Sequence, residues 1–213
     1  MNIRWLGHAC FMMTTEQGTR ILVDPYDASV GYAVRPQEAD VMTISHQHHD
    51  HNYRDMATNN PVVLEAPGQY NVGGLSMEAI ASFHDDVHGA KRGTNLIFTY
   101  LADGLRVCHL GDLGHQPDDE MLHHIGAVDV LMLPVGGVYT LDPEEACALV
   151  RRMRPRVVLP MHYRTQALSF SLATAQDFLA CMDLPDMPPL STLDVNATNI
   201  NLLPPVLLLD WQG

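Results

Sequence analysis

The chain has 213 residues, 46% of them hydrophobic and 17% charged, so it is long enough to bury a core and too apolar for intrinsic disorder. Its 12 Lys and Arg against 25 Asp and Glu give a formal net charge of −13, which argues against nucleic-acid and anionic-membrane partners. We expect a single globular domain over residues 1–213.

The N-terminal segment, the length of the apolar stretches and the cysteine pattern together indicate a cytoplasmic protein. The segment from Met1 to Trp5 lacks the charged and apolar regions of a secretory signal. The longest nearly apolar stretch, residues 202–209, is too short to span a membrane. The four cysteines contain no Cys-x-x-Cys pair, so neither a disulfide scaffold nor a cysteine zinc site is indicated. The oligomeric state is left open.

Short apolar runs separated by glycines and turn-forming residues predict a strand-rich fold. We expect strands at residues 3–6, 9–14, 20–23, 41–44, 62–64, 77–83, 96–101, 105–110, 128–133 and 157–159. The tripeptides Ala39-Asp40-Val41 and Val128-Asp129-Val130 hint at a duplicated strand unit.

Helices are expected mainly in the second half of the chain. Asp142 followed by Pro143 predicts a helix start, apolar residues recur at helical spacing, and Pro155 ends a helix over residues 143–153. Residues 171–182 repeat the pattern, and residues 117–125 do so more weakly. The proline-containing tail 184–205 is expected to be extended and to lead into a final strand at 206–209.

The most informative segment follows the strand predicted at 41–44. It reads Ser45-His46-Gln47-His48-His49-Asp50-His51, a His-x-His-x-Asp-His pattern. Side chains two apart in an extended chain point the same way, so His46 and His48 can bind one metal, and a turn lets Asp50 and His51 face a second position. Imidazole and carboxylate ligands without thiolates suit zinc, and also manganese or iron. The alternative is a solvated polar loop.

Further candidate ligands follow other predicted strands. His84 follows 77–83, Asp112 comes after 105–110, and His162 closely follows 157–159. Loops at strand ends gather along one edge of a sheet, where a site can be assembled from distant parts of the chain.

Over roughly residues 1–182, the chain resembles the metallo-β-lactamase superfamily of metal-dependent hydrolases. The resemblance rests on motifs in the superfamily's order: Gly7-His8, Leu22-Val23-Asp24-Pro25, His46-x-His48-x-Asp50-His51, Ser82-Phe83-His84, Gly111-Asp112, Pro134-Val135-Gly136-Gly137 and Pro160-Met161-His162-Tyr163. The chain looks most like the compact cytoplasmic branch with the ascorbate-phosphate lactonases and the N-acylphosphatidylethanolamine phospholipase D type.

The resemblance implies an α/β fold, a four-layer αββα sandwich, with two divalent metal ions. It places His46, His48 and His84 on the first ion, Asp50, His51 and His162 on the second, and Asp112 as a bridge between them. A hydroxide held between the ions would be the nucleophile, and Asp50 would orient it or pass a proton to the leaving group. Members that use iron for redox chemistry tend to carry an acidic residue at the position of His48 and an attached flavin domain, so redox chemistry is the minority interpretation.

Several other residues have both a functional and a structural interpretation. Asp24 resembles a buried aspartate that supports the metal loop, although Asp-Pro also starts turns. Arg92, next to Lys91, could bind a substrate anion or be a solvated surface charge. Tyr139, after Gly136-Gly137, and Tyr163, after His162, are candidate substrate contacts. His8 is placed equally well near the site or in an exposed loop, and His109 has no assigned role.

These patterns favour a binuclear metal-dependent hydrolase, with zinc as the expected metal, acting on a small, anionic ester, lactone or phosphoester. The alternative is a metal-binding or sensing protein of the same fold without turnover. Nuclease activity is disfavoured by the acidic charge and by the lack of a long basic insertion.

Overall fold

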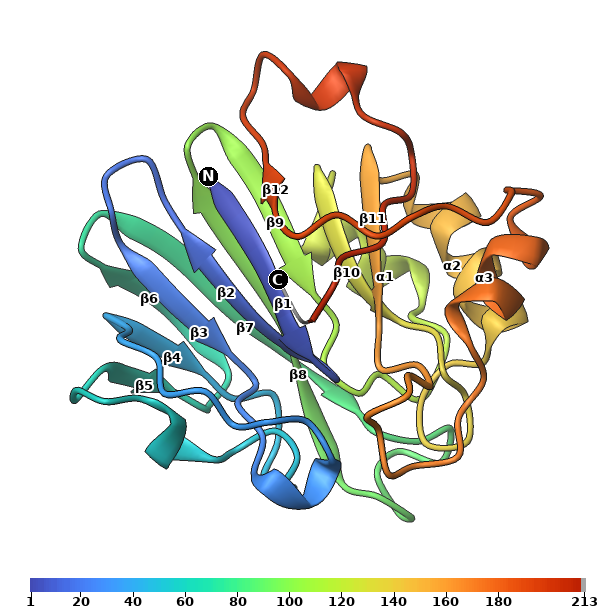
Figure 1. Ribbon diagram of the computed structural model, residues 1–213, viewed down its shortest axis with the longest axis horizontal. Helices are drawn as coiled ribbons and strands as arrows, with labels where there is room; N and C mark the ends of the chain where they lie inside the picture. Colours follow the sequence, from blue (N-terminus) through green and yellow to red (C-terminus); the bar gives the residue numbers. More distant parts are fainter. Residues whose placement is uncertain (212–213) are drawn as a thin grey trace.

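The computed structural model describes residues 1–211, and two six-stranded β-sheets form its centre (Figure 1). The first sheet has the order β12 (Leu193–Asp194), β1 (Asn2–Gly7), β2 (Cys10–Thr14), β3 (Arg20–Val23), β4 (Val41–Thr43) and β5 (Val62–Leu64). The second has the order β11 (Val157–Met161), β10 (Val130–Pro134), β9 (Leu105–His109), β8 (Thr94–Ala102), β7 (Leu75–Phe83) and β6 (Gly68–Val72).

Each sheet combines antiparallel and parallel strands. In the first sheet β1, β2 and β3 are antiparallel neighbours, and β4 and β5 continue parallel to β3. In the second sheet β6 to β9 are antiparallel neighbours, and β10 and β11 continue parallel to β9. Strands β1, β3 and β4 therefore run in one direction within their sheet, as β7, β9, β10 and β11 do within theirs.

The sheets share a repeated detail that fits the duplicated tripeptides. The carboxylate of Asp40, before β4, accepts the backbone N–H of Arg20 at the start of β3, at 2.8 Å. Asp129, before β10, accepts the backbone N–H of Arg106 on β9, also at 2.8 Å. In each case this hydrogen bond holds the start of one strand next to the strand with which it pairs in parallel.

The hydrophobic core lies between the sheets and under the helices. Phe11 of β2 and Phe98 of β8 are fully buried in one cluster, and a 2.7 Å hydrogen bond joins the Thr43 and Tyr100 hydroxyls of opposite sheets. Helices α1 (Asp119–Ile125), α2 (Pro143–Met153) and α3 (Ala175–Cys181) cover the second sheet. The outer face of the first sheet is covered by loops with two short 3₁₀ turns, η1 (Ala28–Val30) and η2 (Arg54–Met56). The predicted α/β sandwich is confirmed, with this outer layer made of loops.

Most predicted elements are observed, and the differences concern β6, β12, the start of α3 and the segment 206–209. Strand β12 is only two residues long and falls within the tail that was expected to be extended. Strand β6 was missed because its sequence, Gly-Gln-Tyr-Asn-Val, contains no apolar run. The predicted helix 171–182 begins only at Ala175, because Thr174 and Asp177 form a capping box that defines its first turn. The expected strand at 206–209 is wrong: Val206 and Leu209 make single bridges to Val158 and Leu190, after two prolines that lack an N–H to donate.

The start of α2 is as predicted. Asp142 and Glu145 form a capping box, and Pro143 occupies the first turn. Within residues 1–211 the structure has no helix with the length and apolar character to cross a membrane.

Candidate metal centre

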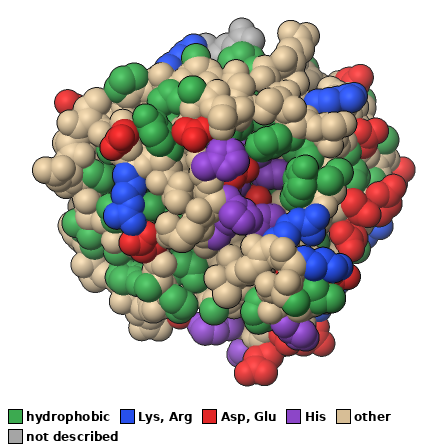
Figure 2. Space-filling model, turned by 90° about the horizontal axis from the view of Figure 1, so that it is seen from below, with side chains coloured by type: hydrophobic (Ala, Val, Ile, Leu, Met, Phe, Trp, Pro, Cys, Tyr) green, Lys and Arg blue, Asp and Glu red, His purple; other side chains and the backbone are tan. Residues whose placement is uncertain are grey.

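The candidate ligands lie at one end of the sandwich because the strands that precede them end there. His8 follows β1, and the His46–His51 segment follows β4 in the same sheet. His84, Asp112 and His162 come after β7, β9 and β11 of the other sheet. Figure 2, which views the molecule from this end, shows histidine side chains gathered in a hollow. The topology thus brings together residues that are up to 154 positions apart, as from His8 to His162, and this is expected from the ends of like-directed strands.

Asp112 is at the centre of the cluster. Its Oδ2 lies 3.1 Å from His84 Nε2, 3.2 Å from His51 Nε2, 3.2 Å from His162 Nε2 and 3.9 Å from His46 Nε2. One carboxylate oxygen therefore contacts imidazoles from both sets of ligands expected from the sequence.

The ligand atoms form overlapping groups, in each of which all atoms lie within 4.8 Å of one another. One group contains His46, His48 and His84, which are the three residues expected on the first ion. Another contains Asp50, His51 and His162, expected on the second ion, together with His8. A third group, His46, His51 and Asp112, connects the two.

The chemistry of these groups fits divalent metal ions. Buried polar side-chain atoms normally have hydrogen-bond partners. Within residues 1–211, several buried atoms of the cluster have none: His46 Nε2, His51 Nε2, His84 Nδ1, His162 Nδ1 and Asp112 Oδ1. His48 is exposed and faces the open side of the site. A set of imidazoles and carboxylates without thiolates suits zinc, manganese or iron.

Charges within the cluster shift its pKa values in opposite directions. Burial alone would lower the pKa of His51, but the carboxylates of Asp112 and Asp50 outweigh it and raise that pKa well above its ordinary value. Burial, reinforced by the neighbouring His51, lowers the pKa of His46. Burial would raise the pKa of Asp112, but His162 and His51 lower it on balance. Metal ions and protons compete for the same imidazole nitrogens, so metal binding at this cluster is expected to depend on pH.

Asp24 orients the imidazole of His51 through its Nδ1 atom. It is fully buried and accepts hydrogen bonds from the Ser45 backbone N–H at 2.8 Å and from the Ser45 hydroxyl at 2.5 Å. Its Oδ2 also lies 2.9 Å from His51 Nδ1, so that ring nitrogen carries the hydrogen and Nε2 points at the cluster as a lone-pair donor. This geometry supports the predicted supporting role.

His109 and Asn95 hold the turn that carries Asp112. His109 is fully buried; its Nε2 lies 2.9 Å from the Ala9 carbonyl, and its Nδ1 accepts the Gly111 N–H at 3.1 Å. Asn95 Oδ1 accepts the backbone N–H of Asp112 at 3.0 Å. A Cβ at Gly111, where φ is +56°, would collide with the Asn95 and Ser45 side chains. His109 therefore supports a predicted ligand, a role that residue spacing did not indicate.

A cavity of about 350 Å³ opens over the cluster and is lined by His48, Asp50, His84, Asp112 and His162. Its remaining wall includes Arg92, Tyr139 and Phe170. The Arg92 guanidinium donates to the Val138 carbonyl at 3.0 Å and lies over the Tyr139 ring, 5.4 Å from its centroid. Phe170, which the sequence did not single out, lies with its ring centroid 6.2 Å from that of Tyr139. Arg92 and Tyr139 are thus brought to the mouth of the site.

Asp85 fixes the loop that carries Arg92. Its carboxylate accepts four backbone N–H groups, from Val87 at 3.0 Å, Gly89 at 2.7 Å, Lys91 at 2.8 Å and Arg92 at 2.7 Å. Burial alone would raise the pKa of Asp85, but these donors lower it on balance. Lys91 is paired with the exposed Asp86 at 3.1 Å and also lines the cavity, so this loop brings two cations, Lys91 and Arg92, to its wall.

Tyr163 is not brought to the cluster. Its ring lies 5.1 Å from that of Trp5, measured between centroids, and lines a separate cavity of about 630 Å³. His162 has a left-handed backbone with φ of +52°, and the chain turns there, so the next side chain leaves the site. The expected substrate contact from Tyr163 is therefore not supported by its position. His49, His88, His123 and His124 are exposed, and His115 is half-buried.

Comparison with known proteins gives consistent matches. The model of the β-lactamase superfamily domain matches residues 2–162. A UPF0173 metal-dependent hydrolase from Pyrobaculum arsenaticum is 33% identical over 192 residues, covering 78% of this chain and 85% of the relative. A Thermotoga maritima crystal structure, assigned to the metallo-β-lactamase superfamily as a proposed zinc-dependent hydrolase, has a TM-score of 0.81 at 35% identity and covers 98% of this chain and 97% of its own. Igni18, a metallo hydrolase from Ignicoccus hospitalis, shares the fold with a TM-score of 0.68 at 22% identity, covering 90% and 97% of the two chains.

Proposed function

Because the chain belongs to the metallo-β-lactamase superfamily and matches UPF0173 metal-dependent hydrolases, we propose that it is a binuclear hydrolase of a small anionic ester, lactone or phosphoester. The observation that carries the proposal is the position of Asp112, whose Oδ2 lies 3.1 to 3.9 Å from imidazoles of both ligand groups. A shared carboxylate offsets the repulsion between two cations that lie about 3.5 to 4 Å apart.

His46, His48 and His84 would hold one ion, Asp50, His51 and His162 the other, and Asp112 both. Two zinc ions held by these residues would lower the pKa of bound water to about 7 and polarise the substrate oxygen, which would supply a nucleophile at neutral pH. Asp24 keeps His51 in the tautomer that can bind metal. Asp50, whose side chain lines the cavity, takes the proton of the attacking water and returns it to the leaving group.

The walls of the cavity support a small anionic substrate. Its volume of about 350 Å³ is at the lower end of the range for small-molecule sites. Arg92 contributes a positive group at the rim, whereas the chain as a whole has a formal charge of −13. Local positive potential inside an acidic protein favours small anions over long polyanions, which would also have to approach the repulsive surface.

Metal analysis tests the binuclear centre. We expect two ions per chain after loading with zinc, and loss of one of them in His51→Ala and in His162→Ala. His49→Ala is the matched control, because His49 is exposed within the same motif and lies outside the groups of ligand atoms. Elemental analysis of the dialysed proteins measures the stoichiometry. One ion in the wild type, unchanged in both variants, would refute the binuclear proposal.

Kinetics of Arg92→Ala test the substrate class. We expect KM for anionic substrates to rise about tenfold, because the guanidinium is a charge-assisted donor, while KM for neutral analogues changes little. A panel of phosphodiesters, lactones and thioesters with and without an added carboxylate measures the difference. Arg151→Ala serves as the control, since Arg151 is an exposed arginine of α2 that does not line this cavity. Equal effects on charged and neutral substrates, or RNA as the best substrate, would contradict the proposal.

A further inference from the structure

His8 occupies a conformation that its surroundings impose. It follows β1 with a left-handed φ of +55°, which is uncommon for a residue other than glycine, and its side chain is fully buried. Its carbonyl accepts the Trp5 indole N–H at 2.9 Å and the His162 backbone N–H at 3.0 Å. Residues persist in such conformations where the surrounding structure over-determines them, and they cluster at functional sites.

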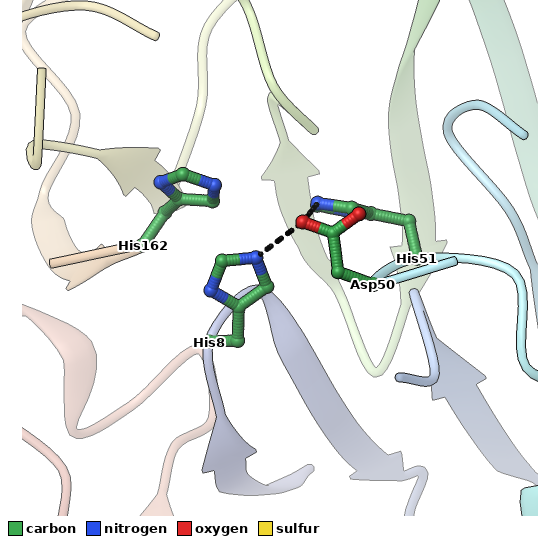
Figure 3. Close-up of side chains that lie close together, drawn as sticks. All are labelled: His8, Asp50, His51 and His162. Carbon is green, nitrogen blue, oxygen red and sulfur yellow. Dashed lines mark hydrogen bonds and ion pairs between the residues drawn. The ribbon is translucent and has the colours of Figure 1, made fainter. Parts of the chain in front are cut away.

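The imidazole of His8 is directed at Asp50. Its Nε2 lies 3.1 Å from Asp50 Oδ2, and its ring centroid lies 4.1 Å from that of His162 (Figure 3). An ionised carboxylate only accepts hydrogen bonds, so the hydrogen of this contact belongs to His8 Nε2. Nδ1 is buried without a hydrogen-bond partner among residues 1–211. The ring therefore makes its one side-chain hydrogen bond to Asp50.

We infer that His8 is a positioning residue, whose Nε2–H holds the Asp50 carboxylate against the second metal position. This inference rests on the proposed binuclear centre. Asp50 lies in the loop after β4, and its side chain is 12% exposed to the cavity. Its other close imidazole, His51 Nε2, is 3.6 Å away from Oδ2. Without His8, rotation about the Cβ–Cγ bond would turn Oδ2 away from that position.

The test compares two residues of similar shape at position 8. Glutamine and methionine are both unbranched and bear the same backbone strain, but only the glutamine amide can donate to Asp50 in place of Nε2. Stepwise zinc titration against a chromophoric chelator measures both affinities. We expect His8→Met to lower the affinity for the second ion about 10- to 100-fold, as for other hydrogen-bond partners of metal ligands. The affinity for the first ion should change by less than about twofold. We expect His8→Gln to stay within about threefold of the wild type for both.

A third variant, together with a measurement of thermal unfolding, distinguishes loss of the hydrogen bond from loss of the fold. His8→Asn suits the left-handed backbone, but its amide is too short to reach Asp50, so it should bind zinc as His8→Met does. Thermal unfolding of the three metal-free variants shows whether the fold is retained. Wild-type affinity in His8→Met and His8→Asn would overturn the inference. Equal weakening in His8→Gln and His8→Met would also overturn it, because it would indicate packing or direct metal ligation in place of hydrogen bonding.

The same titrations separate this inference from the binuclear proposal. A wild type that binds one ion refutes two ions per chain. If His8→Met lowers the affinity for that single ion and His8→Gln does not, the positioning role stands at a mononuclear site. If neither substitution changes its affinity, both proposals fail.

Discussion

Asp24→Asn is expected to weaken the ion bound by His51 while the chain stays folded. Asp24 accepts three hydrogen bonds, from the Ser45 N–H, the Ser45 hydroxyl and His51 Nδ1. An asparagine can still accept the Ser45 N–H through Oδ1, but its NH₂ group would face His51 Nδ1. The imidazole then has to accept there, which moves its hydrogen to Nε2, the atom that faces Asp112 at 3.2 Å. A protonated nitrogen does not bind metal.

We expect the affinity for that ion to fall at least 10- to 100-fold, as for removal of other hydrogen-bond partners of metal ligands. Zinc titration and the visible spectrum of the cobalt-substituted protein measure the effect. Asp40→Asn is the control, because Asp40 is an exposed aspartate that contacts Arg20 in the same sheet. Two ions bound with wild-type affinity in Asp24→Asn would show that His51 does not depend on Asp24 for its tautomer.

Acid unfolding gives the same substitution a second signature. Burial alone would raise the pKa of Asp24, but the hydrogen bond with His51 and the charges of His109 and His51 lower it on balance. A carboxyl whose folded pKa lies below its unfolded value of about 3.9 stabilises the fold above that value, and the contribution is lost as the pH falls through the folded pKa. The stability difference between wild type and Asp24→Asn should therefore shrink below about pH 4.

Asp50→Asn is expected to lower kcat by about 10²- to 10⁴-fold, the usual contribution of a general acid–base group. Asparagine keeps an oxygen that can bind metal and can accept the N–H of His8, so both sites should still fill when zinc is in excess. The amide cannot take a proton from water, so turnover is lost. Steady-state kinetics on the best substrate of the panel, with elemental analysis of the same samples, measure both quantities.

This experiment also separates an enzyme from a metal-sensing protein of the same fold. Asp86→Asn is the matched control, since Asp86 is exposed in a nearby loop and pairs with Lys91. An enzyme loses turnover in Asp50→Asn and keeps it in Asp86→Asn. Unchanged kcat with full metal content in Asp50→Asn would remove Asp50 from the chemistry and contradict its role as proton acceptor.

The sequence by itself determined the features that depend on near neighbours. Short apolar runs separated by glycines and turn-forming residues identified most strands of both sheets, and the Asp142-Pro143 pair located the start of α2. The His46–His51 motif predicted a metal centre because side-chain direction in an extended segment and the ligand chemistry of imidazole are local properties. Their positions after predicted strands indicated the distant candidates His84, Asp112 and His162, and the resemblance assigned them to the two ions. The three residues lie together in the structure.

Only the tertiary structure decided the contacts between distant turns. His8 and His109 are both fully buried at the site, yet the sequence placed His8 equally well near the site or in an exposed loop and gave His109 no role. Tyr163 follows a ligand but points into another cavity, because the backbone turns at His162. Phe170 reaches the cavity from a loop with no periodic pattern. The physical reason is common to all four. The direction and burial of a side chain in a loop or at a strand end depend on which strands end beside it, and that depends on sheet order, which local periodicity does not encode.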